Sequence, residues 1–453
     1  MKKNVIISIF LVLLQTSKIL SYHIKENKIN EDFILTNFTF GSGYLGRYST
    51  NDNIFETINK HNSNLFIWLG NIIYLNTPNY FSFMKNTIKN NWTKGEKLYN
   101  KVKENKYYKM LEKKIPIIGI WDEYDYGIYN GNKYFKDKEI SKHLFLKFLN
   151  YSSEEISEKN KKGIFSTYSF GKGYKSVRII LLDLRYYKSS FFNILNYDNL
   201  GKEQWIWLEN IFKNNNETLT FIGSSIQILP INRFLTESWY INSRKKLFEL
   251  IAKYKKKGII FLSGNVNFSQ ILKTFCVNHK IGYNLYEITS SSLSFNNYNF
   301  YGNLIDNLLP NDYNLGNSFH EINFGEIIID WGNNINDIFI SLNIYDKDNN
   351  KKINLNLKYN DLVFNRNNNN DSNCEYLLNK RFKNPKDIFY YYYNNKKDLP
   401  IGLVYFLLFL FLIQMLTSKK NIVIFISGCI LFMSFIIGYL YKVDLAKEEK
   451  FNE

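Results

Sequence analysis

Five apolar runs, each ending in a polar loop, constrain the fold of this chain more than any other feature. They read LFIWLGNIIY (65–74), IPIIGIWDEYD (115–125), VRIILLDLRYY (177–187), TLTFIGSSIQIL (218–229) and KGIIFLSGNVN (257–267). Runs that are this short and this continuously apolar are typical of strands buried on both faces. Two segments with apolar residues at helical spacing, 202–215 and 243–257, stand among them. The alternation predicts an α/β fold.

The pattern changes after residue 320. EINFGEIIIDW and DIFISLNIYD alternate apolar and polar residues, which predicts edge strands that close the domain near residue 345. We expect a linker or stalk over 346–399, because this stretch contains the polar low-complexity patch NRNNNND at 365–371.

Both ends of the chain carry apolar runs. Residues 1–22 hold two lysines and then about eleven apolar residues, which predicts a secretory signal peptide or, alternatively, an uncleaved signal anchor. Two longer runs, 400–416 and 422–441, predict a transmembrane helical hairpin over 400–441, followed by a charged tail at 442–453. Lys419 and Lys420 in the turn favour a cytosolic turn. We therefore expect an integral membrane protein of the secretory pathway, with the main domain lumenal or extracellular.

The formal net charge of +17 does not indicate a nucleic-acid partner. The lysines are spread along the whole chain among Asn, Ile, Tyr and Phe instead of forming one basic block, and a dispersed charge is weak evidence for nucleic acid. The five histidines show no HxH or HExxH grouping, so we expect each to be structural or solvated.

Short motifs at the ends of the apolar runs resemble those of the alkaline phosphatase D (PhoD-like) family of metallophosphatases. The resemblance covers roughly residues 36–345, and the family's letters are given after ours: FGSG (40–43) and FGSC, FIWLGNIIY (66–74) and FLWLGDxIY, IWDEYDYG (120–127) and TWDDHDYG, ILLDLRYY (180–187) and LLDTRYxR, LGKEQWIWLE (200–209) and LGxxQWxWLE, SSIQILP (224–230) and SSIQVLP, ESW (237–239) and ESW, LSGNVN (262–267) and LSGDVH, YNLYEITSSSLSF (283–295) and YxLYExTSSGLTH. The resemblance implies a two-sheet αββα sandwich of the metallophosphatase type. It also implies that the loops after the strands converge on one site.

The scaffold letters of these motifs are kept, whereas the metal-ligand letters are mostly changed. The resembling enzymes use iron, calcium or another divalent metal, and an aspartate bridges two ions. The positions that the resemblance assigns to ligands hold Gly43, Asn71, Glu123, Tyr124, Asn265, Asn267 and Phe295. An anionic bridge offsets the repulsion between two cations about 3.5 to 4 Å apart, whereas an asparagine offers only a neutral carbonyl oxygen. We therefore interpret the site as degenerate and expect no metal cofactor.

Two functions from different classes follow from the resemblance. The first is a membrane-anchored pseudophosphatase that is catalytically inactive and acts as a binding or structural module, with the membrane as one partner and an unidentified protein as another. The alternative is an active phosphomonoesterase or phosphodiesterase that uses a reduced cation site around Asp122, Glu123 and Asp125. The chain's status as an enzyme is thus open, with inactivity favoured. We also expect Asp183 and Arg185 to form a buried structural pair.

Overall fold

The computed structural model describes ten stretches of the chain: residues 29–30, 32–44, 54–75, 92–158, 162–189, 197–214, 216–230, 237–274, 281–294 and 313–364. The chain divides into two compact units, and all of these residues belong to the first. The predicted signal segment, the apolar runs at 400–441 and the tail at 442–453 lie outside the described residues. Among the residues that are described, no helix has the length and apolar character needed to cross a membrane.

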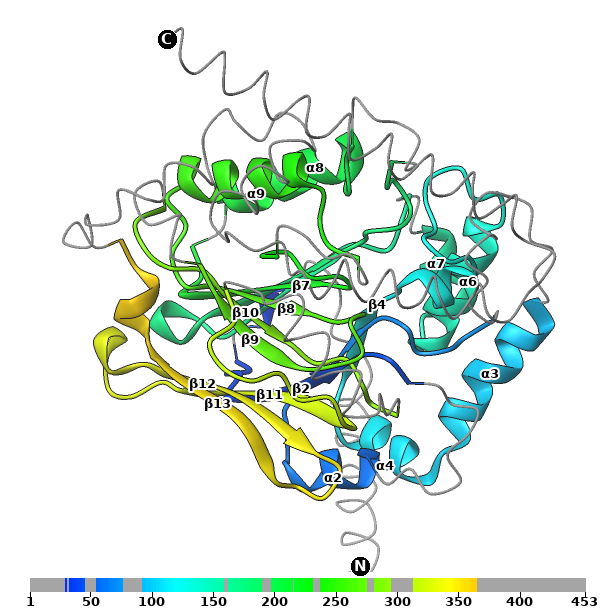
Figure 1. Ribbon diagram of the computed structural model, residues 1–453, viewed down its shortest axis with the longest axis horizontal. Coiled ribbons are helices and arrows are strands. Elements are labelled where there is room, and N and C mark those ends of the chain that lie inside the picture. The colour runs from blue at the N-terminus through cyan, green and yellow to red at the C-terminus, as the bar shows by residue number, and fades with distance from the viewer. Residues whose placement is uncertain are drawn as a thin grey trace, which may run out of the picture. The chain divides into compact units, whose positions relative to one another are not determined.

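Two mixed β-sheets form the centre of the domain (Figure 1). Sheet A has the strand order β1-β5-β6-β7-β8-β10-β9, and sheet B has the order β13-β12-β11-β2-β3-β4. The strands of sheet A are β1 (Ile29–Asn30), β5 (Ser166–Phe170), β6 (Val177–Leu182), β7 (Leu219–Ser224), β8 (Ile259–Ser263), β9 (Gln270–Lys273) and β10 (Tyr286–Thr289). Those of sheet B are β2 (Asn37–Gly41), β3 (Phe66–Leu69), β4 (Ile117–Ile120), β11 (Asn323–Asp330), β12 (Phe339–Asp346) and β13 (Lys351–Lys358).

Helices cover the outer faces of the two sheets, with α8 and α9 over sheet A and α2 and α4 beside sheet B (Figure 1). The helices are α2 (Ile54–Lys60), α3 (Trp92–Glu104), α4 (Lys106–Lys114), α5 (Glu123–Tyr126), α6 (Lys138–Phe148), α7 (Ser153–Glu158), α8 (Gly201–Asn214) and α9 (Ile241–Lys253). The short 3₁₀ turns are η2 (Gly173–Lys175), η3 (Ile335–Asp337) and η4 (Tyr359–Leu362). The expected α/β arrangement of two helix-covered sheets is therefore present.

The five apolar runs form parallel strands, four of them inside the sheets and one, β4, at the edge of sheet B. In sheet A, β6, β7, β8 and β10 are parallel, and in sheet B so are β2, β3 and β4. The two sheets pack face to face, because the rings of Phe38 on β2 and Phe221 on β7 meet edge-on with centroids 5.0 Å apart. Both rings are fully buried. Since strands buried on both faces need no polar side, their sequences read as continuous apolar runs.

Sheet B extends beyond the boundary that we predicted at residue 345. The segment KKINLNLK forms β13, which pairs antiparallel with β12 from Phe339↔Lys358 to Tyr345↔Lys351. Leu357 and Leu362 are buried in the core, so at least this part of the predicted linker belongs to the domain. The prediction failed here because β13 has one solvated face of Lys and Asn, and an Asn-rich tract follows it.

Candidate functional site

The loops that the resemblance assigned to metal ligands meet at one edge of the two sheets. Asn71 follows β3 and Asn265 follows β8, and the Asn71 Nδ2 donates to Asn265 Oδ1 at 2.9 Å. The backbone N–H of Tyr124, in the short helix α5 that follows β4, donates to Asn71 Oδ1 at 3.3 Å. Because parallel strands present their carboxyl ends at the same edge, segments almost 200 residues apart in sequence come into direct contact here. Gly43 and Asn267 lie in neighbouring loops, with Gly43 N bonded to Gly70 O.

Phe295, the last of the assigned positions, lies outside the described residues.

A glycine permits the close approach of the loops after β3 and β4. Gly70 has φ +92°, and a Cβ at this position would lie 2.5 Å from the Cβ of Asp122. Both the left-handed backbone and the lack of space exclude a larger side chain. Gly70 therefore sets the distance between Asn71 and the Asp122 loop.

The three asparagines at positions that the resemblance assigns to ligands share an unusual backbone conformation. Asn71, Asn265 and Asn267 have φ values of 54°, 64° and 59°. Apart from glycine, asparagine and aspartate are the residues that best tolerate this left-handed region. The three loops therefore share a left-handed residue at the assigned position, and the side chain at each is an uncharged amide.

Asp122 is bound by protein donors. Its Oδ1 accepts from Arg185 Nε at 2.6 Å and from Ser225 Oγ at 2.9 Å, and its Oδ2 accepts from Asn71 Nδ2 at 3.4 Å. Asp122 and Arg185 are both completely buried. The guanidinium is therefore the positive charge that neutralises this carboxylate.

A second carboxylate, Glu237, continues the network on the other side of Arg185. Arg185 NH2 donates to Glu237 Oε2 at 2.6 Å, and Lys188 pairs with the other oxygen of Glu237. Burial raises the pKa of Glu237, but the charges of Arg185 and Lys188 outweigh burial and lower it to about 2. Glu237 is accordingly ionised at every physiological pH.

Glu123 lies beside this network without a direct ion pair among the described contacts. Its Oε2 accepts from the backbone N–H of Asn130 at 2.7 Å, and Asn130 Oδ1 accepts in turn from Lys188. Burial raises the pKa of Glu123 to about 8. Burial therefore favours the protonated form of Glu123.

Asp125 holds the site loops together through the backbone. Its Oδ1 accepts from the N–H groups of Ile72 and Ile73 at 2.9 and 3.1 Å and from Tyr99 Oη at 3.3 Å. Its Oδ2 accepts from the N–H of Asp122 at 3.0 Å. Burial raises the pKa of Asp125 to about 7. Asp125 thus links the segments after β3 and β4 by hydrogen bonds to their backbone N–H groups.

Tyr124 stacks on a second tyrosine, Tyr74, which follows β3. Its ring lies 4.3 Å from that of Tyr74, with 24° between the planes. Burial and the nearby carboxylate of Glu123 raise the pKa of Tyr74. An aromatic pair therefore occupies the place where the resemblance puts a histidine ligand.

Asp183 and Arg185 do not form the side-chain pair that we expected. Asp183 Oδ1 accepts instead from Trp121 Nε1 at 2.8 Å and from the backbone N–H groups of Arg185 and Tyr186, so it shapes the turn after β6. The guanidinium points to Asp122 and Glu237. Our structural interpretation of Asp183 holds, but the partner of Arg185 was wrong.

Sequence reasoning did not assign a role to Glu237, Lys188 or Ser225. A signal was present in each case, because Glu237 and Ser225 lie in the matched motifs ESW and SSIQILP. The family motif LLDTRYxR also ends in a basic letter, and Lys188 occupies that position. The residues at these motif positions form the network of ion pairs and hydrogen bonds around Arg185.

The fold is similar to that of a solved phosphatase structure. The structure of PhoD matches 76% of this chain and 74% of its own length, with a TM-score of 0.54 and 13% identity. The domain has the PhoD fold. Weaker likenesses are those to GAP50, described as the anchor in the inner membrane complex of Plasmodium (TM-score 0.44, 11% identity, 76% and 95% coverage), and to a putative 5'-nucleotidase from Staphylococcus aureus (TM-score 0.32, 11% identity, 76% and 57% coverage). No family model and no curated protein sequence matches the chain.

The PhoD fold corrects our expectation about cofactors. This metallophosphatase fold is one of metal-dependent phosphatases, so the blanket expectation of no metal cofactor is overturned. We had inferred it from the lost ligands alone, and an amide or a single carboxylate can still contribute an oxygen to a hard cation.

The residues that the structure describes nevertheless do not fit a two-ion centre. Across these stretches of the chain, no three His, Cys, Asp or Glu side chains are grouped so as to hold a metal ion. The central amide Asn71 donates a hydrogen bond to Asn265 and another to Asp122, and an NH₂ group that points at an oxygen cannot bridge cations. Asn71, at the bridging position, is therefore the residue that fits a two-ion centre least.

Proposed function

We propose that this PhoD-fold protein does not hydrolyse phosphate esters and acts as a binding or structural module tethered to a membrane. The observation that carries the proposal is the bond between Asn71 and Asn265, two amides at positions where the PhoD-like motifs carry aspartates. Hydrolysis at a two-metal site needs an anionic bridge and a positioned nucleophile. The chain offers a closed hydrogen-bonded amide pair instead.

The pair of Asp122 and Arg185 belongs to the scaffold, because both letters are also present in the resembling motifs, and it does not distinguish the two functions. Membrane attachment is supported by the sequence alone, through the apolar runs at 400–416 and 422–441. The domain would then present its loops on the lumenal or external side.

The test is an assay of aryl phosphate monoesters and diesters with the purified full-length chain. We expect no turnover above a mock preparation. The quadruple variant Asn71→Asp, Tyr124→His, Asn265→Asp and Asn267→His should gain affinity for manganese or iron first, and turnover only later, because rate also needs positioning to within about 0.5 Å. Single reversions should change little, since one carboxylate does not offset the repulsion between two cations.

A matched control adds carboxylates at two positions away from the site. Asn62 and Asn150 are exposed and also have positive φ values, so Asn62→Asp with Asn150→Asp adds two carboxylates without approaching the site. This control should bind no additional metal. Turnover by the wild-type chain that is abolished by Glu123→Gln would overturn the proposal and establish the enzyme with a reduced site.

A further inference from the structure

Asn-X-Ser/Thr sequences occur in the described part of the chain, and the function proposed above does not use them. They begin at Asn37, Asn150, Asn216 and Asn267. This three-residue pattern is the acceptor for N-linked glycans, and the modified asparagine has to lie on the surface of the folded protein because the sugar is bulky. The exposure of each asparagine therefore decides which of these sites can carry a glycan.

Asn150 lies at an exposed corner between two helices. It follows the last turn of α6 with a φ of 64°, and asparagine is one of the residues that can end a helix in this left-handed conformation. Ser152 completes the sequence just before α7, and its Oγ accepts from the backbone N–H of Glu155 at 3.1 Å. Both Asn150 and Ser152 are exposed. The amide of Asn150 is therefore at the surface, where a sugar can be attached.

The contacts of the Asn150 side chain are compatible with an attached sugar. Its Oδ1 accepts from Lys103 on α3, and its Nδ2 donates to Glu112 Oε1 on α4 at 2.7 Å. An amide nitrogen carries two hydrogens, and glycosylation replaces one of them while leaving the carbonyl oxygen unchanged. One N–H and the acceptor oxygen thus remain for these contacts in the modified chain.

Asn216 is the second exposed acceptor. It lies between α8 and β7, in the segment that leads into sheet A. Thr218, which completes this sequence, is buried. Transfer takes place on the emerging chain, so the hydroxyl is needed only before folding, whereas the asparagine must stay at the surface afterwards. Burial of Thr218 is therefore compatible with a glycan on Asn216.

The other two asparagines are held within the domain. Asn37 is half-buried on β2, and its Nδ2 donates to the backbone carbonyls of His61 and Asn62 at 3.3 and 3.5 Å. Asn267 is half-buried in the loop after β8, where its backbone N–H donates to Ser291 Oγ at 3.1 Å. Because a glycan fits only at the surface, chains modified at either position would not reach this fold.

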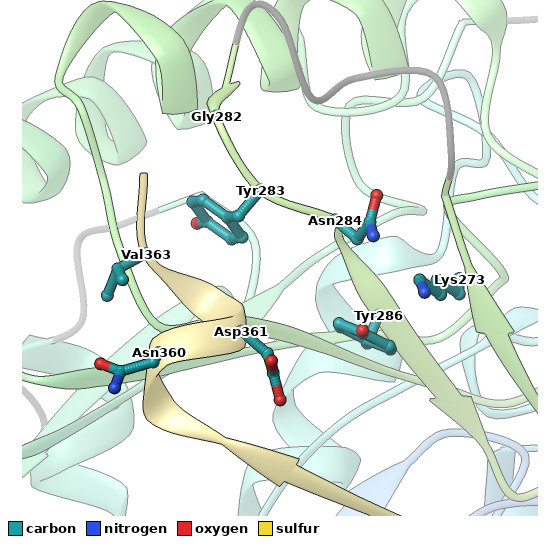
Figure 2. Close-up of a pocket in the computed structure, with 8 residues that line it drawn as sticks. All are labelled: Lys273, Gly282, Tyr283, Asn284, Tyr286, Asn360, Asp361 and Val363. Carbon is teal, nitrogen blue, oxygen red and sulfur yellow. The ribbon is translucent and has the colours of Figure 1, made fainter. Parts of the chain in front are cut away.

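Exposure alone does not make an acceptor. Figure 2 shows two further asparagines, Asn284 and Asn360, beside a small polar pocket at η4. Asn360 is exposed, but Asp361 and Leu362 follow it, so the Ser or Thr that the pattern requires two positions later is missing. Asn360 therefore serves as an internal control that should stay unmodified.

We propose that Asn150 and Asn216 carry N-linked glycans, whereas Asn37 and Asn267 do not. This inference rests on the proposed lumenal or external position of the domain, because oligosaccharides are transferred to asparagine on that side of the secretory membrane. In the transfer, Nδ2 forms a bond to the anomeric carbon of the sugar and loses one proton, while the bond from that carbon to the diphosphate of a lipid carrier breaks. The lipid diphosphate is the leaving group, and the oligosaccharide transferase of the secretory pathway catalyses the step.

The glycan on Asn150 leaves the ligand loops uncovered. Ser141, in the first turn of α6, donates to Tyr126 O on α5, which carries Tyr124 of the site. Asn150 follows the other end of the same helix, about 13 Å further along the axis at 1.5 Å per residue. The sugar therefore covers the face around α3, α4 and α7, and the loops stay open to the partner of the proposed binding module.

The experiment is mass spectrometry of tryptic peptides from the full-length chain, purified from the membranes of the cells that make it. The acceptor sequences fall on separate tryptic peptides, so each asparagine is measured by itself. We expect sugar masses on the peptides with Asn150 and Asn216. The peptides with Asn37, Asn267 and Asn360 should be unmodified. A glycan on Asn37 or Asn267, or an unmodified Asn150 or Asn216, would overturn the proposal.

A reporter separates failure of this inference from failure of the proposed orientation. A glycine-serine extension after Glu453 that ends in an Asn-Ser-Thr sequence lies on the same side of the membrane as the domain if the two apolar runs form a hairpin. A glycan on the reporter without one on Asn150 would overturn the inference and leave the orientation standing. Absence of the glycan from both would overturn the inference together with the orientation.

Variants of the Asn150 sequence test whether the transferase reads the pattern. Asn150→Gln and Ser152→Ala should each abolish the glycan on this peptide, because both remove a part of the acceptor. Ser152→Thr should keep it, since threonine also supplies the hydroxyl. Ser153→Ala changes the neighbouring exposed serine outside the pattern and is the matched control that should keep the glycan too. Retention in Ser152→Ala, or loss in Ser152→Thr, would contradict the assignment of Asn150, and the peptide masses of the wild-type chain do not depend on how any variant folds.

Discussion

At the scale of single residues, the left-handed backbone explains why asparagine stands where the resembling motifs have aspartate. Asn71 and Asn265 lie at φ values of 54° and 64°, where few side chains other than those of Asn and Asp are tolerated. An Asp-to-Asn exchange removes the charge and leaves the loop conformation intact. The proposed loss of the charged ligands is therefore compatible with the scaffold letters that the chain keeps around them.

Arg185 is the residue whose loss should damage the domain most. Its guanidinium neutralises Asp122 and Glu237, and it has no exposed side-chain surface. Arg185→Met leaves these carboxylates without their main cation, so we expect a loss of about 3–5 kcal/mol in the free energy of unfolding. Urea denaturation monitored by tryptophan fluorescence measures this loss.

The matched control for Arg185 is a surface pair. Lys245 and Glu249 on α9 lie 3.7 Å apart, and both are more than half exposed. Lys245→Met should change the free energy of unfolding by less than about 0.5 kcal/mol. Equal effects of the two variants would show that the network around Arg185 is not a stabilising unit.

How far the site could be predicted depends on the kind of information each residue carries. The motif positions of Asn71, Tyr124 and Asn265 were found from the sequence, and the structure brings all three together. The pairing of Arg185 was not found, because its partners Asp122 and Glu237 follow different elements and only the packing of the chain decides which carboxylate it reaches. Patterns along a sequence reveal local structure, whereas such pairs are set by three-dimensional proximity.

At the scale of elements, strands buried on both faces were predictable and strands with one solvated face were less so. β3, β4, β6, β7 and β8 all fall within the five apolar runs. β13 was missed because only its inward residues are apolar and its outward residues are Lys and Asn, which also fill the following tract. Its Leu357 is nevertheless only 3% exposed, which places β13 in the core of the domain.

The turn after β12 carries a histidine contact that should make stability depend on pH. His61 follows α2, with Nδ1 2.7 Å from Glu326 Oε1 on β11 and Nε2 2.6 Å from Asn349 Oδ1 in the β12–β13 turn. The ring also meets Tyr345 edge-on. The positive charge of Lys351 on β13 lowers the pKa of His61. Burial lowers the pKa of His61, but the hydrogen bond and charge of Glu326 outweigh burial and raise it above 6.5.

The sign of the pH effect follows from this raised pKa. A histidine that gains a partner on folding contributes stability that is fully present below the unfolded pKa of about 6.5 and is lost as pH rises through the folded pKa. The difference in free energy of unfolding between wild type and His61→Gln should therefore be about 1–2 kcal/mol at pH 6 and shrink at higher pH. Denaturation at a series of pH values measures it.

His143 offers the control for His61, because it is exposed on α6. His143→Gln should show no stability difference that changes over the same pH range. A difference for His61→Gln that grows with pH would contradict the ion pair with Glu326.

At the scale of the whole molecule, the most informative property is the order of its segments, with the apolar runs following the folded domain. The PhoD-fold domain occupies the first three quarters or so, and the most apolar segments, 400–416 and 422–441, come after it. A domain that needed only to fold would not require such segments, each near the length that crosses about 30 Å of hydrocarbon. The length of these segments supports the proposal that the domain is tethered to a membrane.

The orientation in that membrane gives the last prediction. Lys419 and Lys420 lie in the short turn between the apolar runs, and positively charged turns remain on the cytosolic side. Lys396 and Lys397 before the first run act against this bias, so the orientation needs a direct measurement. An epitope inserted in the turn after Lys420 should be protected when intact membranes or cells are treated with protease from the outer or lumenal side. The same epitope inserted after Asn370, in the predicted stalk, should be cleaved in the same sample, and both should be cleaved once detergent opens the membrane. Cleavage at the turn with protection at Asn370 would place the domain in the cytosol, because a hairpin puts both of its ends on one side and its turn on the other.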